Sequence, residues 1–479
     1  MSENLGDEKM NLVDRERLKH IMPLVITILT LMQPILDIIT SQQLAAGASV
    51  TIGVIFRTLI MAGACIYTVF FSRFDRKKWC MLYIAVISVY IVLFFLVMAN
   101  AGGIYVALQN VKDVIKSFFF LYVLCFFYAV YAEYGALVSD RTLTLVLLFS
   151  ASTIMLAYIT GTSNTTYASG YGFCGWFSSA NEVSDMIIIL APVSIFFLLQ
   201  KVVHGKWWQY IGIILLLLML CLICNLIGTK LVFAVILLYF VLCGGWNFIA
   251  GFARRENRKT RLISGTICLF CTVFMLVGFS NSPLSKYIEN IYVPMMDSSS
   301  EIYQASINED WIDEKDTEDI WMLQVLENNA AVSKINSIFS RRFTGMAYSL
   351  QAYMDGGMDV KLFGIGYIQM DRYKYQMERM VEMDPLLILI RHGILGICIF
   401  LLPILALMVW VIVRWLQHPL KNLQDLRYCT YIYSFLIIIV MSFVAGHTLP
   451  VPSVSYYVIL IIMQIVCITK EAHKNAMLK

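Results

Sequence analysis

The chain has 479 residues with a formal net charge of +4, and 59% of the residues are hydrophobic while only 14% are charged. Soluble domains carry roughly 25% charged residues, so the composition excludes an ordinary soluble domain. We therefore expect a membrane-embedded protein without a nucleic-acid partner.

Apolar windows recur along most of the sequence, and each is long enough to cross a bilayer as a helix of about 20 residues. Continuous apolar runs without strand-like alternation favour helices, and helices satisfy their own backbone hydrogen bonds in lipid. The sequence therefore predicts an all-α polytopic membrane protein. Its twelve predicted spans are 20–40, 50–72, 79–98, 114–132, 142–159, 183–200, 210–226, 231–248, 262–279, 393–415, 428–445 and 453–469.

These spans divide the chain into a membrane domain of nine spans (20–279), a polar loop (280–384) and a second membrane part (385–469). The second membrane part combines a short helix with three spans. Tails over 1–19 and 470–479 flank these parts. The polar loop ends in a segment with helical periodicity followed by a turn signal, so we expect it to form a small helical subdomain.

Six basic connecting or terminal segments fall on one side of this topology. Cytoplasmic loops carry an excess of Lys and Arg, so we expect both termini to be cytoplasmic and residues 280–384 to be external. The membrane is expected to be the plasma membrane. The opposite segments 41–49 and 160–182 contain no Lys or Arg. The basic segments are 9–19, 73–78, 201–206, 254–261, 414–427 and 470–479.

The twelve cysteines do not form a metal-binding or disulfide pattern. Two pairs have CxxC spacing, Cys221 with Cys224 and Cys268 with Cys271. Both pairs lie in predicted membrane helices, where a free Cys behaves as a small hydrophobic residue. Cys174 alone is expected in an outer loop, and it has no evident partner. The sequence therefore predicts no metal site and no disulfide framework.

Ionisable residues gather near the outer ends of the predicted spans. Such residues are costly inside a membrane and are functional candidates by default, although long side chains also anchor at the interface, which is our interpretation of Lys112. Arg57 and Arg391 fit anchoring poorly, because apolar sequence lies on both sides of each. Several cations on one leaflet suggest a bound polyanion, and acidic neighbours suggest proton transfer. The set comprises Asp37, Arg57, Lys112, Lys116, Glu182, Lys230, Arg341, Arg342, Glu382, Asp384 and Arg391.

The stretch EMDPLLILIRHGILG, residues 382–396, places two carboxylates before an apolar run. Asp384 followed by Pro385 predicts a helix N-cap and a first-turn proline, and Gly393 predicts a helix stop. We therefore expect a short helix from Pro385 to His392, ahead of the tenth span. Glu382 lies outside this helix, so it is the freer carboxylate and the better candidate for a general base.

Four motifs, in chain order, resemble elements of the O-antigen ligase and polymerase family, over residues 170–400. The ligases of this family carry a histidine at the position of Glu382, so this chain looks more similar to surface-polysaccharide polymerases of Gram-positive type. The motifs are GFCGWFSSANEVS (172–184), GTK (228–230), SRR (340–342), and KLFGIGY (361–367) followed by EMDPLLILIRHGILG (382–396).

The resemblance implies a fold similar to that of GT-C glycosyltransferases. It also implies glycosyl transfer from a polyprenyl diphosphate carrier at the outer membrane face, without a nucleotide sugar, a metal or another cofactor. Arg and Lys would stabilise the charge of the leaving diphosphate, and Glu382 with Asp384 would act on the acceptor hydroxyl. The candidate diphosphate ligands are Arg57, Lys116, Lys230, Arg341, Arg342 and Arg391, and the motif positions with substrate-binding or structural roles are Asn181, Glu182, Gly364 and Gly366.

Three functions remain open at this point. A polymerase would join lipid-linked repeat units, a ligase would move a finished glycan to a lipid, wall polymer or protein, and a transporter would carry the lipid-linked glycan across the membrane. The transporter is disfavoured because the large loop does not divide the spans evenly and the charges do not lie near the midplane. We expect a polymerase that uses a lipid-linked oligosaccharide, with a flippase and a chain-length regulator as partners.

Overall fold

The computed structural model shows a bundle of long helices. The residues that it describes are 2–135, 138–167, 170–202, 207–253, 258–294, 323–325, 329, 332, 342–368 and 383–477. Within these ranges, eleven helices are long and apolar enough to cross a membrane. This confirms the predicted class of all-α polytopic membrane protein.

Short connections join most of the long helices. These helices are α1 (Ser2–Ala45), α2 (Ile52–Ile66, continued by the π-helix η1, Tyr67–Phe71), α3 (Lys77–Tyr134), α4 (Asp140–Ile159), α5 (Ala180–Val202), α6 (Trp207–Ile227), α7 (Lys230–Ala253), α8 (Arg258–Phe279), α16 (Asp384–Gln417), α18 (Leu426–Val444) and α19 (Pro452–Met477). The short elements are the antiparallel strands β1 (Asn164–Thr165) and β2 (Phe173–Gly175), and α9 (Pro283–Tyr287), η2 (Ile288–Tyr292), α14 (Arg342–Asp355), α15 (Met358–Phe363) and α17 (Pro419–Gln424).

The helix α3 is a hairpin of two membrane-spanning arms. Its backbone leaves the helical region at Gly103, with φ 86° and ψ 170°, which is a conformation that favours glycine. The Ser88 hydroxyl then lies 3.3 Å from the Tyr122 hydroxyl, so the second arm runs back along the first. The two arms correspond to the predicted spans 79–98 and 114–132, and they raise the number of crossings from eleven helices to the predicted twelve.

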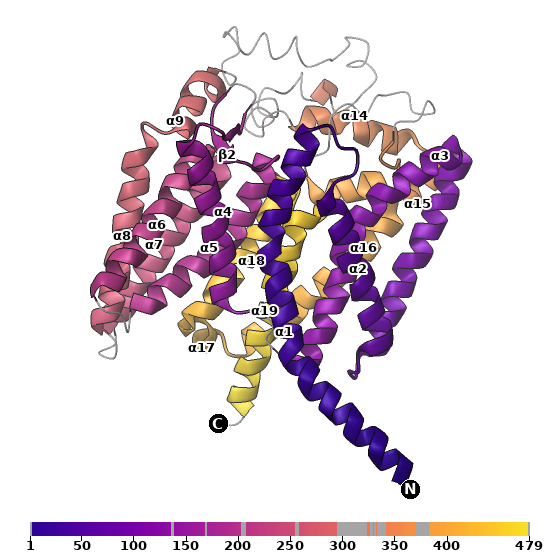
Figure 1. The fold of residues 1–479 in the computed structure, drawn as a ribbon. Coiled ribbons are helices and arrows are strands. Elements are labelled where there is room, and N and C mark those ends of the chain that lie inside the picture. The colour runs from indigo at the N-terminus through magenta and orange to yellow at the C-terminus, as the bar shows by residue number, and fades with distance from the viewer. Residues whose placement is uncertain are drawn as a thin grey trace.

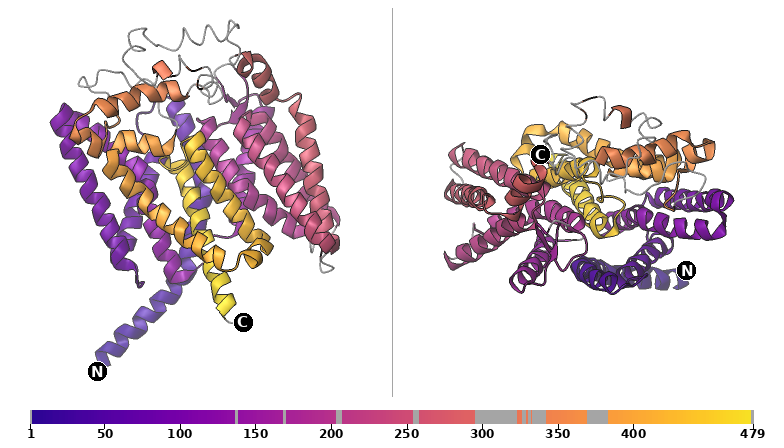
Figure 2. Two further views of the ribbon diagram at one scale, coloured as in Figure 1. Left: turned by 180° about the vertical axis from the view of Figure 1, so that it is seen from behind. Right: turned by 90° about the horizontal axis from the view of Figure 1, so that it is seen from above.

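The helices α5 and α19 form the centre of the bundle. They separate α6, α7 and α8 on one side from α2, α3 and α16 on the other (Figures 1 and 2). Of the most apolar window of each, 89% of residues in α5 and 94% in α19 are buried. Apolarity alone does not select them for this place, because α3 and α16 contain more apolar windows and are far less buried.

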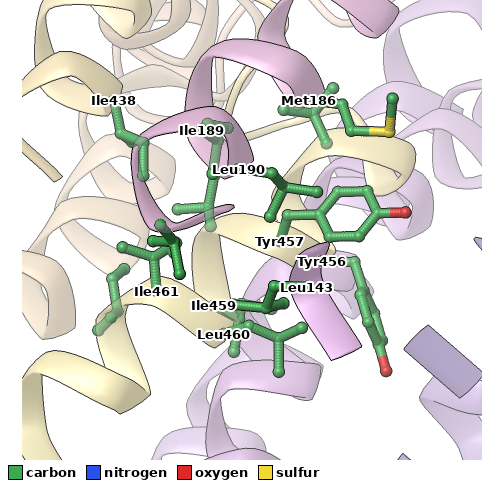
Figure 3. Close-up of a cluster of buried hydrophobic side chains, with 14 of the residues drawn as sticks. Leu143, Met186, Ile189, Leu190, Ile438, Tyr456, Tyr457, Ile459, Leu460 and Ile461 are labelled. Carbon is green, nitrogen blue, oxygen red and sulfur yellow. The ribbon is translucent and has the colours of Figure 1, made fainter. Parts of the chain in front are cut away.

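The packing of this core is shown by a cluster of aliphatic and aromatic side chains from α4, α5, α18 and α19 (Figure 3). Leu143, Ile189, Leu190 and Ile459 are completely buried in it. Tyr456 is also buried, and its hydroxyl lies 3.2 Å from the Thr30 hydroxyl of α1. The core therefore extends to α1, so it fixes the first helix relative to the centre.

Both termini lie at one end of the bundle, and we call the opposite end the distal end (Figure 1). The distal end carries β1, β2, α9, α14 and α15. It also carries the connection between α1 and α2 and the connection between α18 and α19. Three of the described candidate residues, Glu182, Lys230 and Arg342, therefore lie at this end, at the starts of α5, α7 and α14.

Candidate functional site

A cavity of about 550 Å³ lies at the distal end between α1, α2, α3, α5 and the start of α19. We call it the distal cavity. Enclosure by apolar walls with a few convergent polar groups is typical of a ligand site. The apolar walls include Val54, Met61, Ile115 and Phe119, and the charged lining residues are Asp37, Arg57, Lys112, Lys116 and Glu182.

Arg57 of α2 forms an ion pair with Asp37 of α1 through Nη2 and Oδ1. Its Nε atom donates a hydrogen bond to Oε1 of Gln33, at 3.3 Å. Gly53, one turn earlier on α2, permits this approach, because a Cβ atom there would lie 2.2 Å from the Thr40 hydroxyl of α1. Close packing of the first two helices thus brings the arginine to its carboxylate.

Glu182 lies in the first turn of α5, next to Asn181. The hydroxyl of Ser453, in the first turn of α19, donates a hydrogen bond to Oε2 of Glu182. Since Glu182 and Ser453 both line the distal cavity, this contact joins the two central helices at its wall. The Glu182 carboxylate accepts here from a neutral donor, whereas Asp37 is paired with a cation.

Lys112 and Lys116 reach the distal cavity from the second arm of α3. The ammonium nitrogen of Lys116 lies 3.0 Å from Oδ1 of Asp113, and both side chains are about a third exposed. Lys112 is exposed and lines the cavity, so its position fits ligand contact as well as the anchoring that the sequence suggests. These two lysines are more exposed than Arg57, and they add positive charge to the same cavity.

The expectation that all the candidate cations share one site needs correction. Neither Lys230 nor Arg391 is among the residues that line the distal cavity. Lys230 begins α7, beside Thr229, whose hydroxyl lies 3.1 Å from that of Ser184. Arg342 is the first residue of α14, and Arg341 and Glu382 lie outside the described residues.

Arg391, in the motif of residues 382–396, is held by contacts with the preceding KLFGIGY motif (361–367). We call these two motifs together the signature. Its Nη1 atom donates to the carbonyl oxygen of Gly366 at 2.7 Å. In the opposite direction, the Gly366 amide donates to the Arg391 carbonyl at 3.2 Å and the Ile365 amide donates to the Ile390 carbonyl at 2.9 Å. The guanidinium also lies 5.4 Å from the centre of the Tyr367 ring, a cation–π distance. These contacts bury Arg391 away from the cavity.

Glycines allow the two signature segments to cross, and we call this crossing the glycine junction. A Cβ atom at Gly364 would lie 2.3 Å from the carbonyl carbon of Arg391, and one at Gly393 would lie 2.3 Å from that of Leu362. Both glycines have positive φ, +80° and +66°, a conformation that L side chains rarely adopt. Gly364 and Gly393 therefore have a structural role, because no larger residue fits between these backbones. Gly366 also has positive φ, and a Cβ atom there would lie 2.4 Å from the Asn110 side-chain oxygen.

A buried hydrogen-bond network connects the glycine junction to α3. The Tyr367 hydroxyl bonds with the Ser117 hydroxyl and lies 2.9 Å from Nε2 of His392. The Asn110 side-chain oxygen accepts from the backbone amides of Tyr367 and Ile368. Burial raises the pKa of Tyr367 to about 12, so its phenol keeps the proton that it donates. This network was not predicted from the sequence, although Asn110 stands out there as a polar residue beside an apolar run.

The role expected for Asp384 as an N-cap is wrong. Met383 occupies the N-cap position of α16, and Asp384 is the first residue of the helix. Its buried Oδ2 atom accepts from the Ser442 hydroxyl at 3.1 Å and from the backbone amides of Thr448 and Leu449 at 3.0 and 2.9 Å. The carboxylate therefore supports the connection between α18 and α19. The helix does break at Gly393, where the sequence places the end of the short helix.

In the described part of the chain, no group of three or more His, Cys, Asp or Glu side chains is arranged to hold a metal ion. All twelve cysteines are free thiols. Cys174 is a buried residue of β2, and burial raises the pKa of its thiol to about 11. The charged distal cavity is therefore the feature on which a functional interpretation rests.

The support that Asp384 gives to the α18–α19 connection is testable. Asp384→Ala leaves two buried backbone amides without an acceptor, and each such group costs roughly 1–3 kcal/mol. We expect a clearly lower thermal unfolding midpoint in detergent for Asp384→Ala and a smaller decrease for Asp384→Asn, which keeps an acceptor oxygen. An Asp384→Asn protein that unfolds like the wild type but has lost its activity would instead assign the carboxylate a chemical role.

The comparisons with known proteins agree with this architecture. No curated protein matches the chain. The family model described as O-antigen ligase like membrane protein matches residues 19–471, which include the distal cavity, the glycine junction and every membrane-spanning helix described above. The chain therefore belongs to the O-antigen ligase like membrane protein family.

Proposed function

We propose that this protein is a membrane glycosyltransferase that polymerises polyprenyl-diphosphate-linked oligosaccharide repeat units into a surface polysaccharide. Membership of the O-antigen ligase like family supports glycosyl transfer in a membrane. The single observation that supports the substrate class is the distal cavity, where Arg57, Lys112 and Lys116 converge with carboxylates among apolar walls. A flippase that supplies the repeat unit and a chain-length regulator are the expected partners.

The composition of the cavity matches the two chemical parts of such a donor. The cations would bind the diphosphate and stabilise its charge as it leaves, which is most effective where water is scarce. Apolar residues of α2 and α3, such as Met61, Ile115 and Phe119, lie beside these cations and would contact the first units of the polyprenyl chain. A water-soluble nucleotide sugar has no apolar chain that would contact these walls.

The acceptor hydroxyl needs a base, and we propose Glu382 for this role. The acceptor oxygen would bond to the anomeric carbon of the donor, the bond from that carbon to the phosphate oxygen would break, and the hydroxyl proton would pass to the Glu382 carboxylate. Asp384 is less suited, because its Oδ2 atom already accepts three hydrogen bonds.

We propose that the distal end faces the outside and that both termini are cytoplasmic. Basic residues in several described connections support this orientation, because these connections join helix ends that lie with the termini (Figure 1). Examples are Arg73 and Arg76 before α3, and Lys421 in α17. The distal connection between α1 and α2 contains no Lys or Arg.

The orientation predicts an asymmetry of labelling in intact cells. In a background without native cysteines, Met358→Cys on α15 should react with a membrane-impermeant maleimide before lysis, and Leu420→Cys on α17 only afterwards. The two positions are matched controls, since both side chains are 75% exposed but lie at opposite ends. The reverse order of labelling would overturn the orientation.

The activity itself can be tested with purified protein in proteoliposomes and a single lipid-linked repeat unit. We expect products of two or more repeats, with one polyprenyl diphosphate released for each new bond. A ligase would release polyprenyl diphosphate only after addition of a different acceptor. If the lipid-linked unit crosses the membrane without release of any polyprenyl diphosphate, the protein is a transporter and the proposal fails.

The role of Glu382 predicts a specific kinetic defect. Glu382→Gln keeps the shape of the side chain and removes its basicity, and a general base typically contributes 10²–10⁴-fold to the rate. We expect a loss of turnover of roughly that size, while expression and the affinity for the donor stay close to wild type. Polymerisation at the wild-type rate by Glu382→Gln would show that another group accepts the proton.

A further inference from the structure

The most buried cation of the distal cavity already has an anionic partner. The side chains of Arg57 and Asp37 are only 12% and 17% exposed, and both residues line the cavity. A buried ion pair is tolerated because each charge compensates the other, and removal of one partner leaves a costly buried charge. A diphosphate that binds Arg57 must therefore compete with Asp37.

A second arginine–carboxylate pair in the described part of the chain lies outside the cavity and serves for comparison. At the end that carries the termini, Arg427 donates to both carboxylate oxygens of Asp140, at 3.1 and 2.9 Å, and the Tyr431 hydroxyl donates to the same carboxylate at 2.8 Å. Neither charged residue of that pair lines the distal cavity. The Arg57 guanidinium, in contrast, contacts Asp37 through Nη2 alone and faces the space where a ligand would bind.

The charges around the cavity argue that the competition is strong. Three cationic side chains line it, Arg57, Lys112 and Lys116, together with two carboxylates, Asp37 and Glu182. Lys116 is further paired with Asp113 on its own helix. The charged side chains in and beside the cavity are thus close to electrically balanced. A bound diphosphate would be repelled by Asp37 as long as that carboxylate remains beside Arg57.

We propose that Asp37 is a competing internal anion that sets the affinity of the distal cavity for diphosphate and drives release of the polyprenyl diphosphate product. In the empty state Asp37 holds Arg57, the donor's diphosphate replaces it, and Asp37 takes Arg57 back after transfer. The donor compensates for this competition with contacts to its oligosaccharide, which the product lacks. The inference rests on the proposed function, and Asp37 acts through Arg57, so it is a positioning residue.

Asp37→Asn tests this inference because it keeps the size of the side chain and removes the competing charge. The probe is farnesyl diphosphate in detergent, measured by calorimetric titration. We expect its dissociation constant to fall at least about fivefold, the lower end of the coupling typical of linked equilibria. With a lipid-linked repeat unit, single-turnover rates should stay near wild type while steady-state kcat falls and KM falls with it, because product release becomes slow.

Matched variants separate this effect from a change of fold. Asp37→Glu restores the carboxylate and should bring affinity and kcat back towards wild type. Asp355→Asn makes the same chemical change at an exposed position on α14, where the carboxylate accepts from Gln351 at 2.9 Å outside the cavity, and should change nothing. Farnesol and farnesyl phosphate test whether the gain follows the diphosphate: farnesol should bind equally to wild type and to Asp37→Asn.

The outcomes distinguish this inference from the function on which it rests. If Asp37→Asn, or Asp37→Ser where the first variant unfolds, binds farnesyl diphosphate no better than the wild type while Arg57→Gln loses binding, the competing-anion role is overturned and the diphosphate site stands. If Arg57→Gln also binds and polymerises normally, the distal cavity is not the diphosphate site. A tighter complex together with an unchanged steady-state kcat would overturn the role in product release.

Discussion

Charge neutralisation in a medium without water is the constraint on which the distal cavity depends. The Asp37–Arg57 ion pair satisfies it for two side chains that apolar helices carry into the membrane region. Because both members also line the cavity, the contact that compensates the arginine charge inside the protein is the same contact with which the proposed diphosphate ligand would compete.

The fold was largely predictable from the sequence, since a membrane helix is encoded locally in a continuous apolar run. Even the hairpin of α3 appears in the sequence as two apolar windows on either side of Gly103. The sequence also indicated that Arg57 needs an anionic partner or a polar site, because apolar residues lie on both sides of this cation. The Glu182–Ser453 contact was not, because the two residues are separated by most of the chain and meet only when α5 and α19 pack.

The wrong interpretations share a physical cause. Asp384 before a proline fits a local capping pattern, but its donors lie 58–65 residues further along the chain, and a local pattern cannot reveal them. Arg391 looked like a ligand cation because its partners, the Gly366 carbonyl and the Tyr367 ring, belong to a segment 25 residues earlier. A charge that needs a partner can be recognised in the sequence, but a partner from a distant segment of the same protein becomes visible only in the packed structure.

The glycine junction shows how a signature outside the cavity can still act on it. Its backbone crossing places Tyr367 against Ser117 on the second arm of α3. The preceding residue on that helix is Lys116, which lines the distal cavity from a neighbouring face. Helices are stiff over a single turn, so a displacement of the junction would move this lysine as well. The signature motif therefore contributes to the proposed diphosphate site by fixing the position of α3, and Arg391 needs no contact with the ligand to matter for it.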